Sequence, residues 1–71
     1  MTIDEIELYF QIFGYPEIDI EIRPGVTIRK EDAEIFVTNT LLTLRAHSGN
    51  KRFMPYYDAL IKYYHIIRWN Q

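Results

Sequence analysis

The fold is decided by the stretch EIDIEIRPGVTIRKEDAEIFV, residues 17–37. In its first half apolar and charged residues alternate, which is the spacing of an extended strand with one buried face. Pro24-Gly25 interrupts the alternation with a turn, because proline presets φ and glycine accepts a positive φ. In its second half the apolar spacing becomes that of a helix. The stretch therefore predicts a β-like arm at about residues 17–29 that leads directly into a helix.

The arm has two interpretations, which the sequence leaves open. Ile18, Ile20 and Ile22 share one face, and the alternation resumes at residues 26–28. A short hairpin closed by the Pro-Gly turn explains this pattern, although type II turns match the twist of a hairpin poorly. An extended arm laid across the helices would produce the same alternation.

Helical periodicity on both sides of the arm predicts three helices. They fall at about residues 3–13, 30–47 and 53–68. The first opens on a capping box, in which the Thr2 hydroxyl accepts a hydrogen bond from the Glu5 amide. We therefore expect a single domain over the whole chain. Its fold class is mainly α or small α+β, with three helices and a short β-hairpin or extended arm between the first two.

Composition excludes several classes of protein. The chain has 71 residues, of which 48% are hydrophobic, so it has the apolar content for a core and is not disordered. It contains no cysteine, which excludes disulfides, thiolate nucleophiles and cysteine-based zinc sites. The first residues are acidic where a secretory signal would be basic, and no apolar run approaches the ~18 residues of a membrane span. We expect a soluble cytoplasmic protein without membrane contacts.

Each predicted helix carries apolar residues beyond the single face that a small core needs. The candidate interface residues are Ile35, Leu42, Tyr56, Tyr63 and Ile66, and the first helix adds Leu8 and Ile12. One interpretation is that the isoleucine arm covers one or two of these second faces. The other is a surface for a partner, because monomers rarely leave contiguous apolar patches larger than a few hundred Å².

The sequence lacks the residue patterns of catalytic and metal sites. Asp4 and Glu7 share a helix face, but an open first turn does not desolvate either carboxyl as acid–base catalysis requires. His47 and His65 lie too far apart for a local metal-ligand motif, and Ser48 has no glycine elbow around it. The glycines are isolated, so no phosphate-binding loop is expected. We expect no enzymatic activity, no cofactor and no metal.

Charge is segregated along the chain, although the net charge is only −2. Residues 1–22 hold six acidic residues and no basic one, whereas residues 45–71 hold five basic residues and one acidic one. If the two ends pack together, much of this segregation is internal complementarity. Alternatively, the basic, tyrosine-rich C-terminal helix binds nucleic acid, although the acidic net charge argues against this. The candidate contacts are Lys51, Arg52, Lys62 and Arg68.

Four short motifs follow the amphipathic N-terminal helix. They are Arg23-Pro24-Gly25-Val26-Thr27-Ile28, Phe36-Val37, Leu41-x-x-Leu44 and Pro55-Tyr56. Their order resembles a family of small, functionally uncharacterised bacterial domains of the Bacteroides type, and the resemblance covers most of the chain. It implies a bacterial, cytoplasmic origin and supports the turn at Pro24-Gly25. That family has no assigned activity, so the resemblance implies no functional residues.

The sequence thus ranks two functions. The first is a non-enzymatic protein-interaction module, whose partner is an unknown protein or a second copy of the chain. The second is a nucleic-acid-binding accessory protein that uses the basic C-terminal helix.

Overall fold

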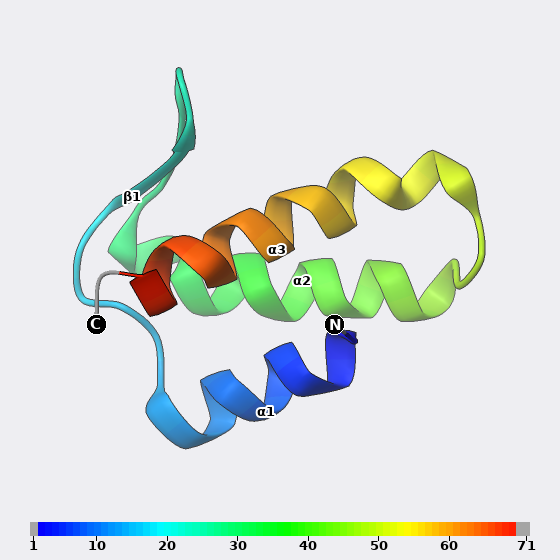
Figure 1. Cartoon of the computed structure of the whole chain (residues 1–71), viewed down its shortest axis with the longest axis horizontal. Helices are drawn as coiled ribbons and strands as arrows, with labels where there is room; N and C mark the ends of the chain where they lie inside the picture. Colours follow the sequence, from blue (N-terminus) through cyan, green and yellow to red (C-terminus); the bar gives the residue numbers. More distant parts are fainter. Residues whose placement is uncertain (1, 70–71) are drawn as a thin grey trace.

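The computed structural model describes residues 2–69, which form three helices and one β-hairpin (Figure 1). The helices are α1 (Ile3–Phe13), α2 (Ala33–Ala46) and α3 (Met54–Trp69). The strands are β1 (Ile20–Arg23) and β2 (Val26–Ile28), and the short 3₁₀ turns η1 (Lys30–Asp32) and η2 (Lys51–Phe53) precede α2 and α3. The expected three-helix, mainly α fold with a hairpin between the first two helices is confirmed.

The arm is a hairpin and not an extended strap. β1 and β2 pair antiparallel, with Ile20 opposite Ile28, and the Pro-Gly dipeptide closes the turn. Gly25 has a φ of 82°, which a type II turn requires at its second central residue. The register shifts between Glu21 and Arg23. A bulge of this kind increases strand twist, which offsets the poor match between such a turn and a hairpin.

Polar contacts fix the junction between the hairpin and α2. The backbone N–H of Lys30 donates to Asp19 Oδ1 at 2.9 Å, which ties η1 to the segment before β1. Within η1 and its flank, Arg29 Nε donates to Asp32 Oδ2 at 3.2 Å. The α-helix itself starts at Ala33, three residues later than expected, because the chain first makes a 3₁₀ turn.

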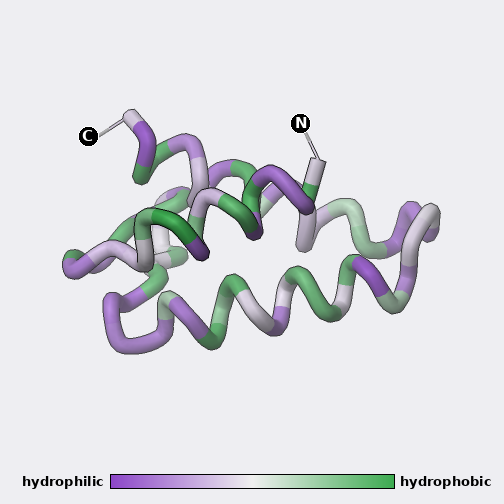
Figure 2. Tube along the Cα trace, turned by 90° about the horizontal axis from the view of Figure 1, so that it is seen from below, coloured by the Kyte–Doolittle hydropathy of each residue, from purple (hydrophilic) through white to green (hydrophobic). Residues whose placement is uncertain are grey.

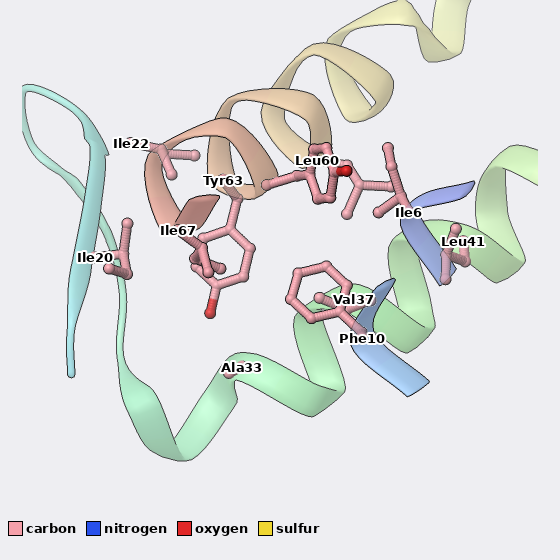
Figure 3. Packing of buried hydrophobic residues seen from close by; sticks show 11 residues of the cluster. Ile6, Phe10, Ile20, Ile22, Ala33, Val37, Leu41, Leu60, Tyr63 and Ile67 are labelled. Carbon is pink, nitrogen blue, oxygen red and sulfur yellow. The ribbon is translucent and has the colours of Figure 1, made fainter. Parts of the chain in front are cut away.

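All three helices and β1 contribute to one apolar core, which Figure 3 shows from close by. Its buried members are Ile6, Phe10, Ile20, Ile22, Ala33, Val37, Leu41, Leu60, Tyr63, Tyr64 and Ile67. β1 packs on α3, so its two inward-facing isoleucines meet that helix. The hairpin therefore covers one side of α3 that would otherwise lie open.

Tyr63 lies at the centre of this core and is fully buried. Its ring stacks against Phe10 at a centroid separation of 6.1 Å and meets Phe36 edge-on at 5.2 Å. The expectation that Tyr63 belongs to an outer interface is therefore wrong. The sequence pattern of α3 alone did not reveal that the hairpin turns this second face into core.

The hydroxyl of Tyr63 is buried and has no hydrogen-bond partner among the described residues. Burial, with a smaller contribution from Tyr15, raises the pKa of Tyr63 to about 12 from its ordinary value of 10.0. The folded state therefore retains this proton at a pH at which the unfolded state has lost it. Stability associated with the neutral phenol is fully present below about pH 10 and is lost as the pH rises towards 12.

Tyr63→Phe keeps the buried ring and removes the unpaired hydroxyl. Because an unsatisfied buried hydroxyl costs about 1–3 kcal/mol, we expect the free energy of unfolding at neutral pH to stay unchanged or to rise by about 1 kcal/mol. Above about pH 10 the wild type should lose stability relative to the variant. Urea unfolding followed by circular dichroism measures both effects. The half-exposed Tyr56→Phe serves as the control, and clear destabilisation of Tyr63→Phe at neutral pH would contradict the unpaired hydroxyl.

Candidate interaction surface

The hairpin covers the second face of α3 but leaves the outer faces of α1 and α2 open. On α1, Leu8 and Ile12 are 55% and 64% exposed. On α2, Ile35 and Leu42 are 61% and 67% exposed. Such fractions are high for large aliphatic side chains, which contribute most when they are buried. The surplus apolar surface therefore lies on α1 and α2.

The five residues proposed as an interface from the sequence do not form one surface. Ile35 and Leu42 are exposed on α2, and Tyr56 is half-exposed near the start of α3. Ile66 is partly buried against the core, and Tyr63 is inside it. Only the two α2 residues are both exposed and on a common face.

The outer face of α2 consists of Ile35, Thr38, Asn39, Leu42 and Ala46, all of which are exposed. At 3.6 residues per turn these positions recur on one side of the helix, opposite the buried residues. The chain has no charged residue from position 35 to position 44. Figure 2 shows α2 along the lower edge of the molecule, with no other part of the chain below it. An exposed helix face that lacks charge over several turns is unusual for a purely solvated surface.

A groove between α1 and α2 runs beside this face and has a volume of about 300 Å³. Phe10, Val37 and Leu41 form its apolar floor, and Thr38 and Leu42 are shared with the outer face of α2. The groove and the outer face are therefore one continuous surface.

Arg45 closes one end of the groove by joining α2 to α1. Its Nη2 donates to Asp4 Oδ1 at 2.9 Å and to Glu7 Oε1 at 3.0 Å, and its Nη1 donates to Glu7 Oε2 at 3.1 Å. The hydrogen bonds to Glu7 and then to Asp4 raise the pKa of Arg45. A two-pronged contact of this kind is the geometry in which an exposed ion pair contributes to stability. Part of the charge segregation along the sequence is therefore internal complementarity.

The Arg45 clasp was only partly foreseeable from the sequence. Asp4 and Glu7 stand three residues apart at the acidic end of the chain, so a common basic partner was the available signal. The sequence could not identify Arg45 as that partner, because its position depends on how α1 packs on α2.

The four basic residues proposed for nucleic-acid binding are not brought together. Lys51 and Arg52 precede α3, whereas Arg68 lies near its end, about 24 Å further along the helix axis. Lys62 and Arg68 point about 120° apart around α3. Arg68 also lies over the rings of Tyr9 and Tyr64, with its Nη1 donating to the Tyr64 hydroxyl at 3.1 Å. A single four-residue basic patch is therefore wrong.

Aromatic rings gather where Lys51 and Arg52 stand. His47 and Phe53 stack at 4.0 Å with an angle of 6° between their planes, and Phe53 and Tyr56 stack at 5.6 Å. We call these three residues the aromatic stack. It lies at the turn between α2 and α3 and combines flat rings with two exposed cations.

The rest of the described chain offers little that resembles a reaction centre. Within residues 2–69 no three histidine or carboxylate side chains are grouped so that they could hold a metal ion. None of the helices in that range combines the length and the apolar character needed to cross a bilayer.

These features define the class of the protein as a small, mainly helical domain with an inserted hairpin and an uncharged outer helix. Residues 1–68 match the family described as Domain of unknown function (DUF6965), and the chain belongs to that family. The expected membership in an uncharacterised family is confirmed. No curated protein and no solved structure matches the chain. Its function must therefore be argued from the surface itself.

Arg45→Met retains the apolar stem of the side chain and removes the clasp. We expect the midpoint of thermal unfolding to fall by a few degrees at low ionic strength, with faster amide exchange in α1. The loss should shrink in about 1 M NaCl, because salt screens exposed ion pairs. Lys62→Met, on the exposed face of α3, removes the same charge without touching the clasp. Equal effects of the two variants would contradict a role for Arg45 in holding α1.

Proposed function

We propose that the protein is a non-enzymatic protein-interaction module whose contact surface is the outer face of α2 with the adjoining groove. The observation that carries the proposal is the exposure of Ile35 and Leu42 on a helix face that has no charge from position 35 to position 44. The hairpin covers α3 and leaves this face open.

Packing requirements support this assignment. The buried side of α2 is already filled by Ala33, Val37 and Leu41. The two exposed aliphatic residues therefore add nothing to the core of the monomer. Burying a side chain of this size against a partner contributes roughly 1.5–3 kcal/mol. The polar residues Thr38 and Asn39 between them can exchange hydrogen bonds with a partner backbone or side chain.

A photo-reactive amino acid at position 42 tests the proposal in cells that express the full chain. With p-benzoylphenylalanine in place of Leu42, we expect irradiation to cross-link the chain to another protein, including a second copy. The same amino acid at position 62 is the matched control, because Lys62 is exposed on the polar side of α3. Mass spectrometry identifies the products. Cross-linking at position 42 that does not exceed that at position 62 would overturn the proposal.

Nucleic-acid binding is a second candidate, now restricted to the turn between α2 and α3. The aromatic stack beside Lys51 and Arg52 favours it, because rings stack on exposed bases while cations meet phosphates. Lys62 and Arg68 take no part in this smaller site.

Fluorescence anisotropy with a labelled single-stranded RNA at about 50 mM salt tests the second candidate, since phosphate contacts are strongest at low salt. We expect weak binding, with a Kd on the order of 10⁻⁴–10⁻⁶ M. Lys51→Gln with Arg52→Gln should abolish it, and Lys62→Gln with Arg68→Gln should leave it unchanged. Equal losses for the two pairs, or no binding by the wild type, would exclude this function.

A further inference from the structure

We infer that the outer face of α2 binds a second copy of the same chain, with the two α2 helices antiparallel about a two-fold axis that passes near Thr38 and Asn39. This inference rests on the proposed function and names the partner. It is carried by the spacing of the apolar residues, by the charges at the two ends of α2 and by the position of Asn39.

The apolar residues are spaced for self-recognition. Ile35 and Leu42 stand seven residues, or two helical turns, apart on the same exposed face. The midpoint between them falls between Thr38 and Asn39. In an antiparallel pair centred there, Ile35 of each copy packs on Leu42 of the other. Such an arrangement uses the same patch on both subunits, as a two-fold interface requires.

The charges select the antiparallel orientation. Glu31 and Glu34 stand at the start of α2, and the turn after α2 carries Lys51 and Arg52. Antiparallel packing brings the acidic end of each α2 towards the basic end of the other, twice per dimer. It also aligns the opposite ends of the two helix dipoles. A parallel pair would place Glu34 beside its own copy, where like charges repel.

The middle of the face carries polar groups that match each other across the axis. An asparagine amide offers both a donor and an acceptor, so two copies of Asn39 can satisfy each other. A single polar residue of this kind in an apolar helix interface fixes register at some cost in stability. The groove beside Leu42 adds contact area, because Thr38 and Leu42 line it as well as the outer face.

Sedimentation of the purified full chain over roughly 5–500 μM tests whether a second copy binds. The face of one short helix is a small interface, so we expect a monomer–dimer equilibrium within that range and not a tight dimer. Leu42→Lys should weaken association roughly tenfold or more, because it places a charge in the apolar contact. Leu42 is exposed in the monomer, so this variant should fold normally by circular dichroism. Leu8→Lys, on the outer face of α1, is the matched control and should leave association unchanged.

Single cysteines test the orientation cleanly, because the chain has no cysteine of its own. Asn39→Cys lies next to the two-fold axis and should form a disulfide-linked dimer under mild oxidation. Ala46→Cys lies on the same exposed face but about 22 Å from its copy along the helix axis, so it should not. Comparable cross-linking of both variants would indicate parallel packing and overturn the antiparallel arrangement.

A wild type that remains monomeric over the whole range would overturn the second copy as partner. In that case, photo-cross-linking from position 42 to a different protein would still support the interaction module. The absence of any cross-link there would remove both.

Discussion

The packing of the hairpin against α3 is the contact on which the rest of the structure depends. The chain is small, and three amphipathic helices alone would leave one side of α3 uncovered. Ile20 and Ile22 from β1 close that side and enclose Tyr63, whose ring then contacts Phe10 of α1 and Phe36 of α2. One aromatic side chain thereby links all three helices. Its unpaired hydroxyl is a polar cost that the surrounding apolar contacts outweigh.

Because the hairpin covers only α3, the molecule is asymmetric in what it exposes. α1 is held by Ile6 and Phe10 inside and by the Arg45 clasp outside, so its acidic first turn is largely occupied by an internal ion pair. α2 buries one side and exposes the other, and the exposed side carries aliphatic and uncharged polar residues. This distribution supports recognition of a partner better than it supports catalysis, which needs convergent polar groups in a concave, desolvated site.

The same asymmetry separates the two functions proposed for the chain. The uncharged face of α2 and the aromatic stack with its two cations are chemically different surfaces, one apolar and one basic. The dispersal of Lys62 and Arg68 away from the stack weakens the nucleic-acid hypothesis. The continuity of the α2 face with the groove strengthens the interaction hypothesis, because a partner helix can contact both at once. Membership in the DUF6965 family leaves this choice to physical argument.

The sequence by itself determined the three helices, the turn at Pro24-Gly25 and the lack of a local metal or nucleophile motif, because these depend on periodicity, φ preferences and residue identity over short distances. It also identified the surplus apolar residues. Only the tertiary structure decided which of them remain exposed: it placed Tyr63 in the core and left Ile35 and Leu42 open. It likewise chose Arg45 as the partner of Asp4 and Glu7. Those outcomes depend on where the hairpin packs and how α1 approaches α2. Long-range contacts set both arrangements, and local sequence patterns do not encode them.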